Sequence, residues 1–172
     1  MGRSHGFVHV GTSSDTPQFA VDSIRQWWLA YGKKHYDQGH ELLVLADAGV
    51  SHGYRPRHFK KRLQERIADA LGLKVTVCHF PSGTSKWNPV EHRFFGPMSC
   101  HGSSIPLCSL EWLLRLIRTT VTRGGLKVCA RLTGTTYRTG IRVSDEEMRM
   151  LNLQRHRVCP PWNYTITPRQ YV

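Results

Sequence analysis

The sequence predicts an α/β protein with a parallel sheet, and the central third of the chain carries this prediction. LLVLAD (42–47) is a continuous apolar run, which is typical of a strand buried on both faces. Residues 56–71 form an amphipathic pattern that opens with a proline and is closed by Gly72, and LKVTVCHF (73–80) is a second apolar strand. A strand, a helix and a strand in this order make a βαβ unit with parallel strands.

The residues before this unit predict one strand and one helix. GFVHVG (6–11) alternates like a short strand. Asp15 and Thr16 are suitable N-caps, and Pro17 suits a first helical position, so a helix is expected over 16–32.

The residues after this unit predict a helix that begins at Pro89 and an amphipathic helix over 109–123. Two alternating stretches follow, LKVCARL (126–132) and TTYRTGIRV (135–143). Ser144, with a glutamate three residues later, forms a capping box for a short helix. The tail that follows, CPPWNYTITPRQYV, is rich in proline and is expected to wrap the surface.

Length and charge limit the function. A chain of 172 residues fits one domain, and 24 Lys and Arg against 12 Asp and Glu give a net charge of +12. Such a chain attracts polyanions, of which nucleic acid is the leading candidate. No apolar run reaches the roughly 18 residues of a membrane span, so no membrane partner is expected. Five cysteines without a C-x-x-C pair, and no apolar signal segment, favour the reducing cytoplasm.

Two carboxylates, Asp47 and Glu91, are expected at one edge of the sheet. Asp47 ends the first buried strand, where open α/β sheets place their sites, and Glu91 begins a helix shortly after the second strand. Such a pair suits Mg²⁺ or Mn²⁺, and two such ions can activate water and stabilise a leaving oxygen. The residues alone leave an alternative open: Asp47 caps a turn, and Glu91 is a first-turn acid favoured by the helix dipole.

The segment SKWNPVEHRFFG (85–96) closely resembles the signature around the last catalytic acid of DDE-type insertion-sequence transposases. With LLVLADAGVSHGYR before it and WNYTI near the end, the chain resembles one bacterial family of the DDE superfamily, the Rhodopirellula-type transposase DDE domain. The resemblance runs from about Gly6 to Ile166.

The resemblance implies an RNase H-like fold, in which helices flank a mixed sheet and three acids bind two Mg²⁺ ions. Asp47 would be the second acid and Glu91 the third. The implied activity is hydrolysis of a phosphodiester at a transposon end, followed by attack of the freed 3′-hydroxyl on target DNA.

The first acid of this fold lies on its first strand, but residues 1–14 contain no Asp or Glu. We therefore expect an N-terminally truncated copy that lacks the opening strands and leaves a sheet edge exposed. Residues 1–143 would be a partial catalytic domain, and residues 144–172 a short helix and tail packed on it. Without one acid, a two-metal mechanism loses several kcal/mol of transition-state stabilisation, so little transposition is expected from this chain alone. A separately encoded N-terminal piece could supply the missing acid.

Basic residues near the two acids are expected to contact DNA phosphates. They are Arg55, Arg57, Lys60, Lys61, Lys86, His92 and Arg93. The alternative is a solvated basic helix face. At the level of function, the alternative is a non-catalytic basic DNA-binding fragment, or an inhibitor that competes with an intact transposase. Association of several copies of the chain is compatible with either function.

The loop after Asp47 differs from the family tendency toward a run of glycines and an asparagine, because it carries Ala48, Val50 and His52. Asp47, Ser51 and His52 are also the residue types of a hydrolase triad. No G-x-S-x-G elbow is present, so hydrolase chemistry is not expected.

Overall fold

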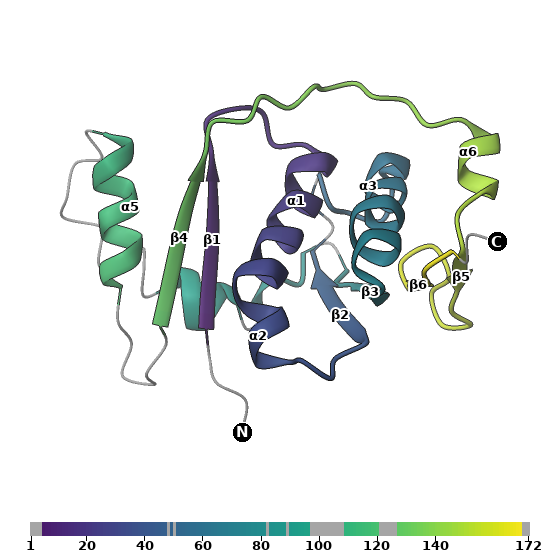
Figure 1. Cartoon of the computed structure of the whole chain (residues 1–172), viewed down its shortest axis with the longest axis horizontal. Helices are drawn as coiled ribbons and strands as arrows, with labels where there is room; N and C mark the ends of the chain where they lie inside the picture. Colours follow the sequence, from purple (N-terminus) through teal and green to yellow (C-terminus); the bar gives the residue numbers. More distant parts are fainter. Residues whose placement is uncertain are drawn as a thin grey trace. The chain divides into compact units, whose positions relative to one another are not determined.

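A computed structural model describes residues 5–47, 49, 51–81, 83–88, 90–96, 109–120 and 127–169. The chain divides into two compact units (Figure 1). The small unit comprises Met1–Thr12 and Thr84–Thr135, and the large unit comprises Ser13–Gly83 and Thr136–Val172.

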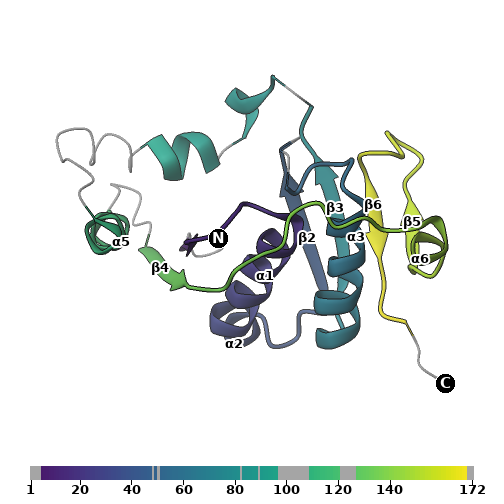
Figure 2. The ribbon, with the colours of Figure 1, turned by 90° about the horizontal axis from the view of Figure 1, so that it is seen from above.

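The large unit contains a four-stranded sheet in the order β2-β3-β6-β5 (Figure 2). Its strands are β2 (Glu41–Ala46), β3 (Lys74–His79), β5 (Leu153–Arg155) and β6 (Tyr164–Ile166). Strands β2 and β3 run parallel, whereas β6 is antiparallel to both β3 and β5. The parallel pair confirms the predicted βαβ unit, and the sheet as a whole is mixed.

Helices of the large unit follow the predicted signals. Helix α1 (Pro17–Trp27) begins after Thr16, whose side chain accepts a hydrogen bond from the backbone N–H of Phe19. It continues through a π-helical turn into α2 (Lys33–His35), three residues beyond the predicted end at Gly32. Helix α3 (Arg57–Leu63) continues through the π-helical turn Gln64–Asp69.

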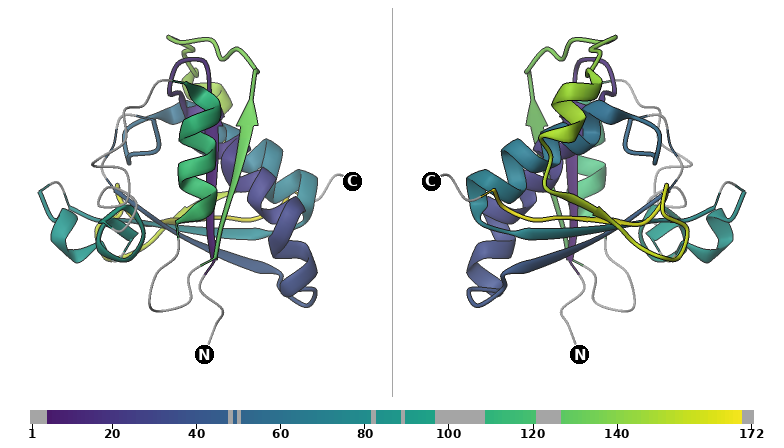
Figure 3. Two further views of the ribbon diagram at one scale, coloured as in Figure 1. Left: turned by 90° about the vertical axis from the view of Figure 1, so that its left-hand side faces the viewer. Right: turned by 90° about the vertical axis from the view of Figure 1, so that its right-hand side faces the viewer.

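One face of this sheet carries the helices and the core (Figure 3). Side chains from α1, α3 and the turn after α3 pack on alternate residues of β3 and β6. The fully buried members are Val21, Phe59, Leu63, Ile67, Ala68, Val75, Val77, Tyr164 and Ile166. The α/β class with a mixed sheet flanked by helices is as expected for an RNase H-like DDE fold.

The opposite face of β2 is not covered as predicted. Leu42 and Val44 pack against the core, but the side chains of Leu43 and Leu45 are 60% and 57% exposed. Strand β2 is an edge strand in this sheet, and successive side chains point to opposite faces. The expectation that 42–47 is buried on both faces is therefore wrong.

The C-terminal residues differ from the predicted surface wrap. Tyr164–Ile166 forms β6 between β3 and β5, and all three residues are buried. The alternating stretch 135–143 is not a strand, and Gly140 within it adopts the left-handed conformation with φ of 69°. Ser144 does form a capping box, and it starts α6 (Asp145–Arg149).

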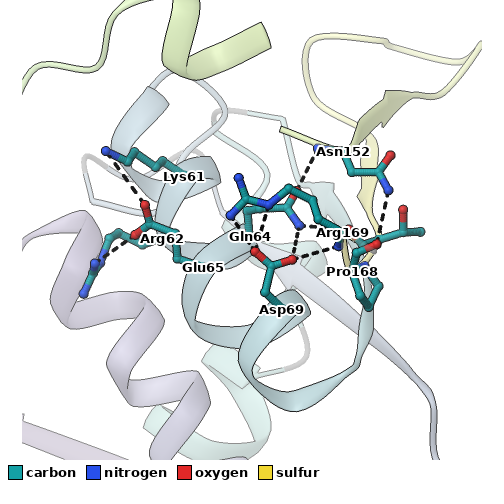
Figure 4. A network of polar contacts seen from close by, with 9 residues as sticks. Lys61, Arg62, Gln64, Glu65, Asp69, Asn152, Pro168 and Arg169 are labelled. Carbon is teal, nitrogen blue, oxygen red and sulfur yellow. Dashed lines mark hydrogen bonds and ion pairs between the residues drawn. The ribbon is translucent and has the colours of Figure 1, made fainter. Parts of the chain in front are cut away.

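A buried polar network joins the end of the π-helical turn to the C-terminal residues (Figure 4). Gln64 is fully buried; its amide donates to Asp69 and to the carbonyl of Thr167, and its oxygen accepts from the Asn152 N–H. The guanidinium of Arg169 donates two bonds, at 3.0 and 2.6 Å, to the other oxygen of Asp69. This network anchors the chain beyond β6.

In the small unit, β1 (His5–Gly11) and β4 (Lys127–Thr133) are parallel and in register. Among the described strands, β1 pairs with β4 alone. Helix α5 (Leu110–Thr119), capped by Ser109 as predicted, packs Leu114 and Ile117 against Ala130 of β4. The helix expected from Pro89 is a π-helical turn, Glu91–Phe95.

Close packing in the small unit also explains one glycine. A β-carbon at Gly6 would collide with the ring of Phe94, so β1 needs a glycine there.

In the described part of the chain, no helix is long and apolar enough to cross a membrane.

Candidate functional site

Asp47 lies at the carboxyl end of β2, where the sequence predicts a site. Its carboxylate is half-exposed, and Oδ1 accepts a hydrogen bond from the backbone N–H of Gly49 at 2.8 Å. The same oxygen lies 2.8 Å from Nε2 of His52. A β-carbon on Gly49 would lie 2.7 Å from this oxygen, so any other residue there would force the carboxylate to shift.

His52 is held in turn by Ser51. The Ser51 hydroxyl lies 2.9 Å from Nδ1 of His52, and Ser51 is 1% exposed. A neutral imidazole has one N–H and one acceptor nitrogen. With the N–H on Nε2, a neutral His52 donates to Oδ1 of Asp47 and accepts from the Ser51 hydroxyl.

Asp47, His52 and Ser51 are the three residue types of a hydrolase triad, and here they lie in contact. The sequence did not predict hydrolase chemistry, because it lacks a G-x-S-x-G elbow. A nucleophile has to reach its substrate, but Ser51 is buried. The geometry therefore suits support of the carboxylate: Ser51 holds the imidazole, and the imidazole holds Asp47.

A second histidine, His79, contacts the backbone of the loop that follows Asp47. His79, at the end of β3, is buried; its Nδ1 lies 2.6 Å from the Trp162 carbonyl and its Nε2 lies 3.0 Å from the His52 carbonyl. The indole of Trp162 stacks on the ring of Tyr54 at 4.9 Å. These contacts fix the loop between β3 and the residues just before β6. His79 is not among the site residues predicted from the sequence, because both of its partners are backbone carbonyls distant in sequence.

Several basic residues predicted to contact DNA already have partners in the protein. Lys60 is buried, and its amine donates to the Tyr54 carbonyl; burial, then Arg155 and Arg57, lower the pKa of Lys60. Lys61 pairs with Glu147 at 2.5 Å.

Arg55 and Arg57, which flank Pro56, are exposed at the surface. Arg55 donates to the Tyr54 hydroxyl, and Arg57 pairs with Asp145 at 2.6 Å. Their roles toward DNA, like those of Lys60 and Lys61, stay predictions.

Glu91 belongs to the small unit and begins the π-helical turn. Asn88 of the Trp-Asn-Pro motif accepts a hydrogen bond from the Val90 N–H through its side chain, which shapes the turn just before Glu91. Nε2 of His92 lies 3.0 Å from the Lys86 carbonyl. Lys86, His92 and Arg93 are all exposed. Asp47 lies in the large unit, so its expected meeting with Glu91 stays a prediction.

Asp47 offers one free oxygen that suits a divalent ion. Among the described residues, Oδ2 has no hydrogen-bond partner, whereas Oδ1 has two. Mg²⁺ is commonly held by one or two carboxylates together with substrate phosphates. Within the described ranges, no cluster of three or more His, Cys, Asp or Glu side chains forms a complete metal site. The role of Asp47 as a metal ligand therefore stays a prediction.

Comparison with known proteins agrees with the motifs. Residues 1–168 match the family model described as Rhodopirellula transposase DDE domain. No curated protein and no solved structure shows significant similarity to the chain. The family match covers nearly the whole sequence, so it confirms the resemblance drawn from the motifs around Asp47 and Glu91.

Proposed function

The chain belongs to the Rhodopirellula transposase DDE domain family, and on that premise we propose that it acts on DNA in transposition, with Asp47 and Glu91 as ligands of Mg²⁺ or Mn²⁺. The reaction would be hydrolysis of a phosphodiester at a transposon end, followed by strand transfer to target DNA. The observation that carries this proposal is the carboxylate of Asp47, fixed at the end of β2, whose Oδ2 has no partner among the residues that the structure describes.

The residues around Asp47 would orient its carboxylate for metal binding. A carboxylate that binds a metal is usually oriented by hydrogen bonds from neighbouring groups. Here the Gly49 N–H and His52 hold Oδ1, which leaves Oδ2 for an incoming ion. A bound divalent ion would polarise the phosphodiester and neutralise charge that develops on its oxygens.

We further propose that residues 1–172 alone give little or no strand transfer. A two-ion site in this family uses three acids, and neither β1 nor the residues up to 14 contain an Asp or Glu. We expect a polypeptide that carries the first acid to restore activity when it is added to residues 1–172. Loss of the first acid, which would be shared by the two ions, removes several kcal/mol of transition-state stabilisation.

The alternative is a basic DNA-binding protein that does not cut, including an inhibitor of an intact transposase. The net charge of +12 favours this alternative, because phosphate contacts give sequence-independent affinity without any metal. A DNA shift that depends on salt, with no cleavage in either metal, would support it.

The proposal is tested by titrating Mn²⁺ into the intact chain and into Asp47→Asn, Glu91→Gln and Asp37→Asn. Asp37 is an exposed acid in the same unit as Asp47, so it controls for loss of one charge. We expect weaker Mn²⁺ binding in the first two variants and unchanged binding in the third. Equal affinity in all four proteins would overturn the assignment of the metal ligands.

Cleavage is measured in parallel on labelled DNA that carries the sequences flanking the coding region. We expect no robust product with Mg²⁺ or Mn²⁺ from residues 1–172. Efficient cleavage that Asp47→Asn abolishes would contradict the proposed inactivity but support the metal site. Efficient cleavage that Asp47→Asn leaves intact would refute both.

A further inference from the structure

A cleft lined by arginines lies at the N-terminal end of α1 in the large unit. The cavity measures about 560 Å³. It is lined by Thr16 and Pro17 at the start of α1, by Arg57 and His58 at the start of α3, and by Arg138 and Arg142 from the irregular segment before α6. We call this feature the arginine cleft.

Two of the three arginines that line the cleft have no polar partner within the described ranges. Arg138 and Arg142 are exposed, and neither makes a hydrogen bond or ion pair with any residue that the structure describes. Arg57 is different, because it pairs with Asp145 and donates to the Val143 carbonyl at 3.3 Å. Arg57 therefore holds the segment that presents the other two side chains.

The other groups of the cleft also suit an anion. The start of an 11-residue helix carries the positive end of the helix dipole, which favours negative charge. His58 adds ring nitrogens that can form hydrogen bonds, and burial, then Arg62 and Lys61, lower its pKa. Among the described residues that line the cleft, Asp15 is the one acid, and it is outnumbered by Arg138 and Arg142.

The position of the cleft points to an extended anion rather than a small one. The loop that leaves Asp47 ends at Pro56, which lines the cleft. The first turns of α1 and α3 lie at the same end of the large unit as the carboxyl end of β2 (Figure 1). A chain of phosphates that lies on the arginines can therefore continue along the end of the unit that carries Asp47.

We propose that the arginine cleft binds consecutive backbone phosphates of DNA, with Arg138 and Arg142 each contacting one phosphate. Planar guanidinium groups match phosphate oxygens in bidentate geometry, so two free arginines in one cleft are well suited to this task. The proposal rests on the proposed function, which names DNA as the substrate. It adds a surface, separate from the metal ligands, that binds the DNA backbone.

The test compares the intact chain with Arg138→Ala/Arg142→Ala and with Arg149→Ala/Arg157→Ala. The second pair removes the same charge from exposed residues of the same unit that do not line the cleft. Binding of a labelled DNA duplex is followed by fluorescence anisotropy in EDTA, between about 50 and 200 mM salt. Circular dichroism and thermal unfolding show whether each variant is folded.

We expect the cleft variant to bind about tenfold more weakly than the intact chain. The slope of log K against log salt should fall by about 1.8, which is about 0.9 for each lost phosphate contact. The control pair should change the slope by less than half as much. A double variant that combines Arg138→Lys with Arg142→Lys should keep most of the slope because the charge remains.

Three outcomes would overturn the inference, and they differ in what else they overturn. Equal losses in the cleft and control variants would mean general attraction, and DNA binding by the chain would stand. Binding of inorganic phosphate at the affinity of the duplex would mean a small-anion site. No binding of DNA by the intact chain would overturn both the cleft and the proposed function.

Discussion

His52 Nε2 lies 2.8 Å from Oδ1 of Asp47, so the loop after β2 supplies the group that orients the acid at the end of this strand. The imidazole is itself fixed by buried Ser51. A side chain held in this way keeps its carboxylate in one orientation before any metal arrives. The loop therefore has a defined role even though His52 departs from the family tendency.

Replacing His52 by alanine should weaken Mn²⁺ binding by about 10- to 100-fold, because the carboxylate of Asp47 loses one of the two groups that orient it. His52→Asn should recover part of the affinity, since its amide can also donate to the carboxylate. Calorimetric titration with Mn²⁺ measures both effects. His40→Ala, at an exposed residue before β2, is the matched control. Unchanged affinity in His52→Ala would show that the contact is not needed for metal binding.

Replacing Asp69 by asparagine should lower the free energy of unfolding by about 1 to 3 kcal/mol at pH 7, because the guanidinium of Arg169 loses its charged acceptor. Urea unfolding measures this change. Asp37→Asn, at an exposed acid, should cost nothing measurable. A loss of equal size in both variants would contradict the role given to this network.

The same network predicts how stability depends on pH. Burial raises the pKa of Asp69, but hydrogen bonds from Arg169 and Gln64 outweigh it and hold the pKa below its ordinary value. The stabilisation is therefore complete above the unfolded pKa of about 4 and is lost as the pH falls through the folded pKa. Unfolding midpoints between pH 7 and 3 should fall more steeply for the intact chain than for Asp69→Asn. Parallel curves would refute this linkage.

The two faces of the sheet in the large unit should differ in their tolerance of substitution. Leu45→Ala should change the free energy of unfolding by less than about 0.5 kcal/mol, because its side chain is mostly exposed. Val77→Ala, at a fully buried residue of β3, should cost roughly 1 to 3 kcal/mol. Denaturant titration of the two variants decides the matter, and a larger cost at Leu45 would mean that this face is covered in solution.

Local signals in the sequence predicted most of the large unit. Thr16 followed by Pro17 marks the start of α1, and Ser144 with Glu147 marks α6, because caps act within one helical turn. The apolar runs of β2 and β3 predicted the parallel pair. These features depend on neighbours in sequence, so they can be predicted without a structure.

Features that depend on residues distant in sequence could not be predicted from the sequence. Strand β6 is only three residues long, and its burial depends on pairing with β3 far away in sequence. The apolar run of β2 carried no sign of which face would receive helices. The Asp47–His52 contact likewise depends on the path of a loop, and a sequence pattern does not specify that path.

The central claim is that Asp47 and Glu91 bind the same divalent ion, and a crystal structure with Mn²⁺ tests it most directly. The account predicts an anomalous peak within roughly 2.0 to 2.6 Å of an oxygen from each carboxylate, with His52 still beside Asp47. Carboxyl groups more than about 10 Å apart, or turned away from each other around separate ions or none, would contradict it.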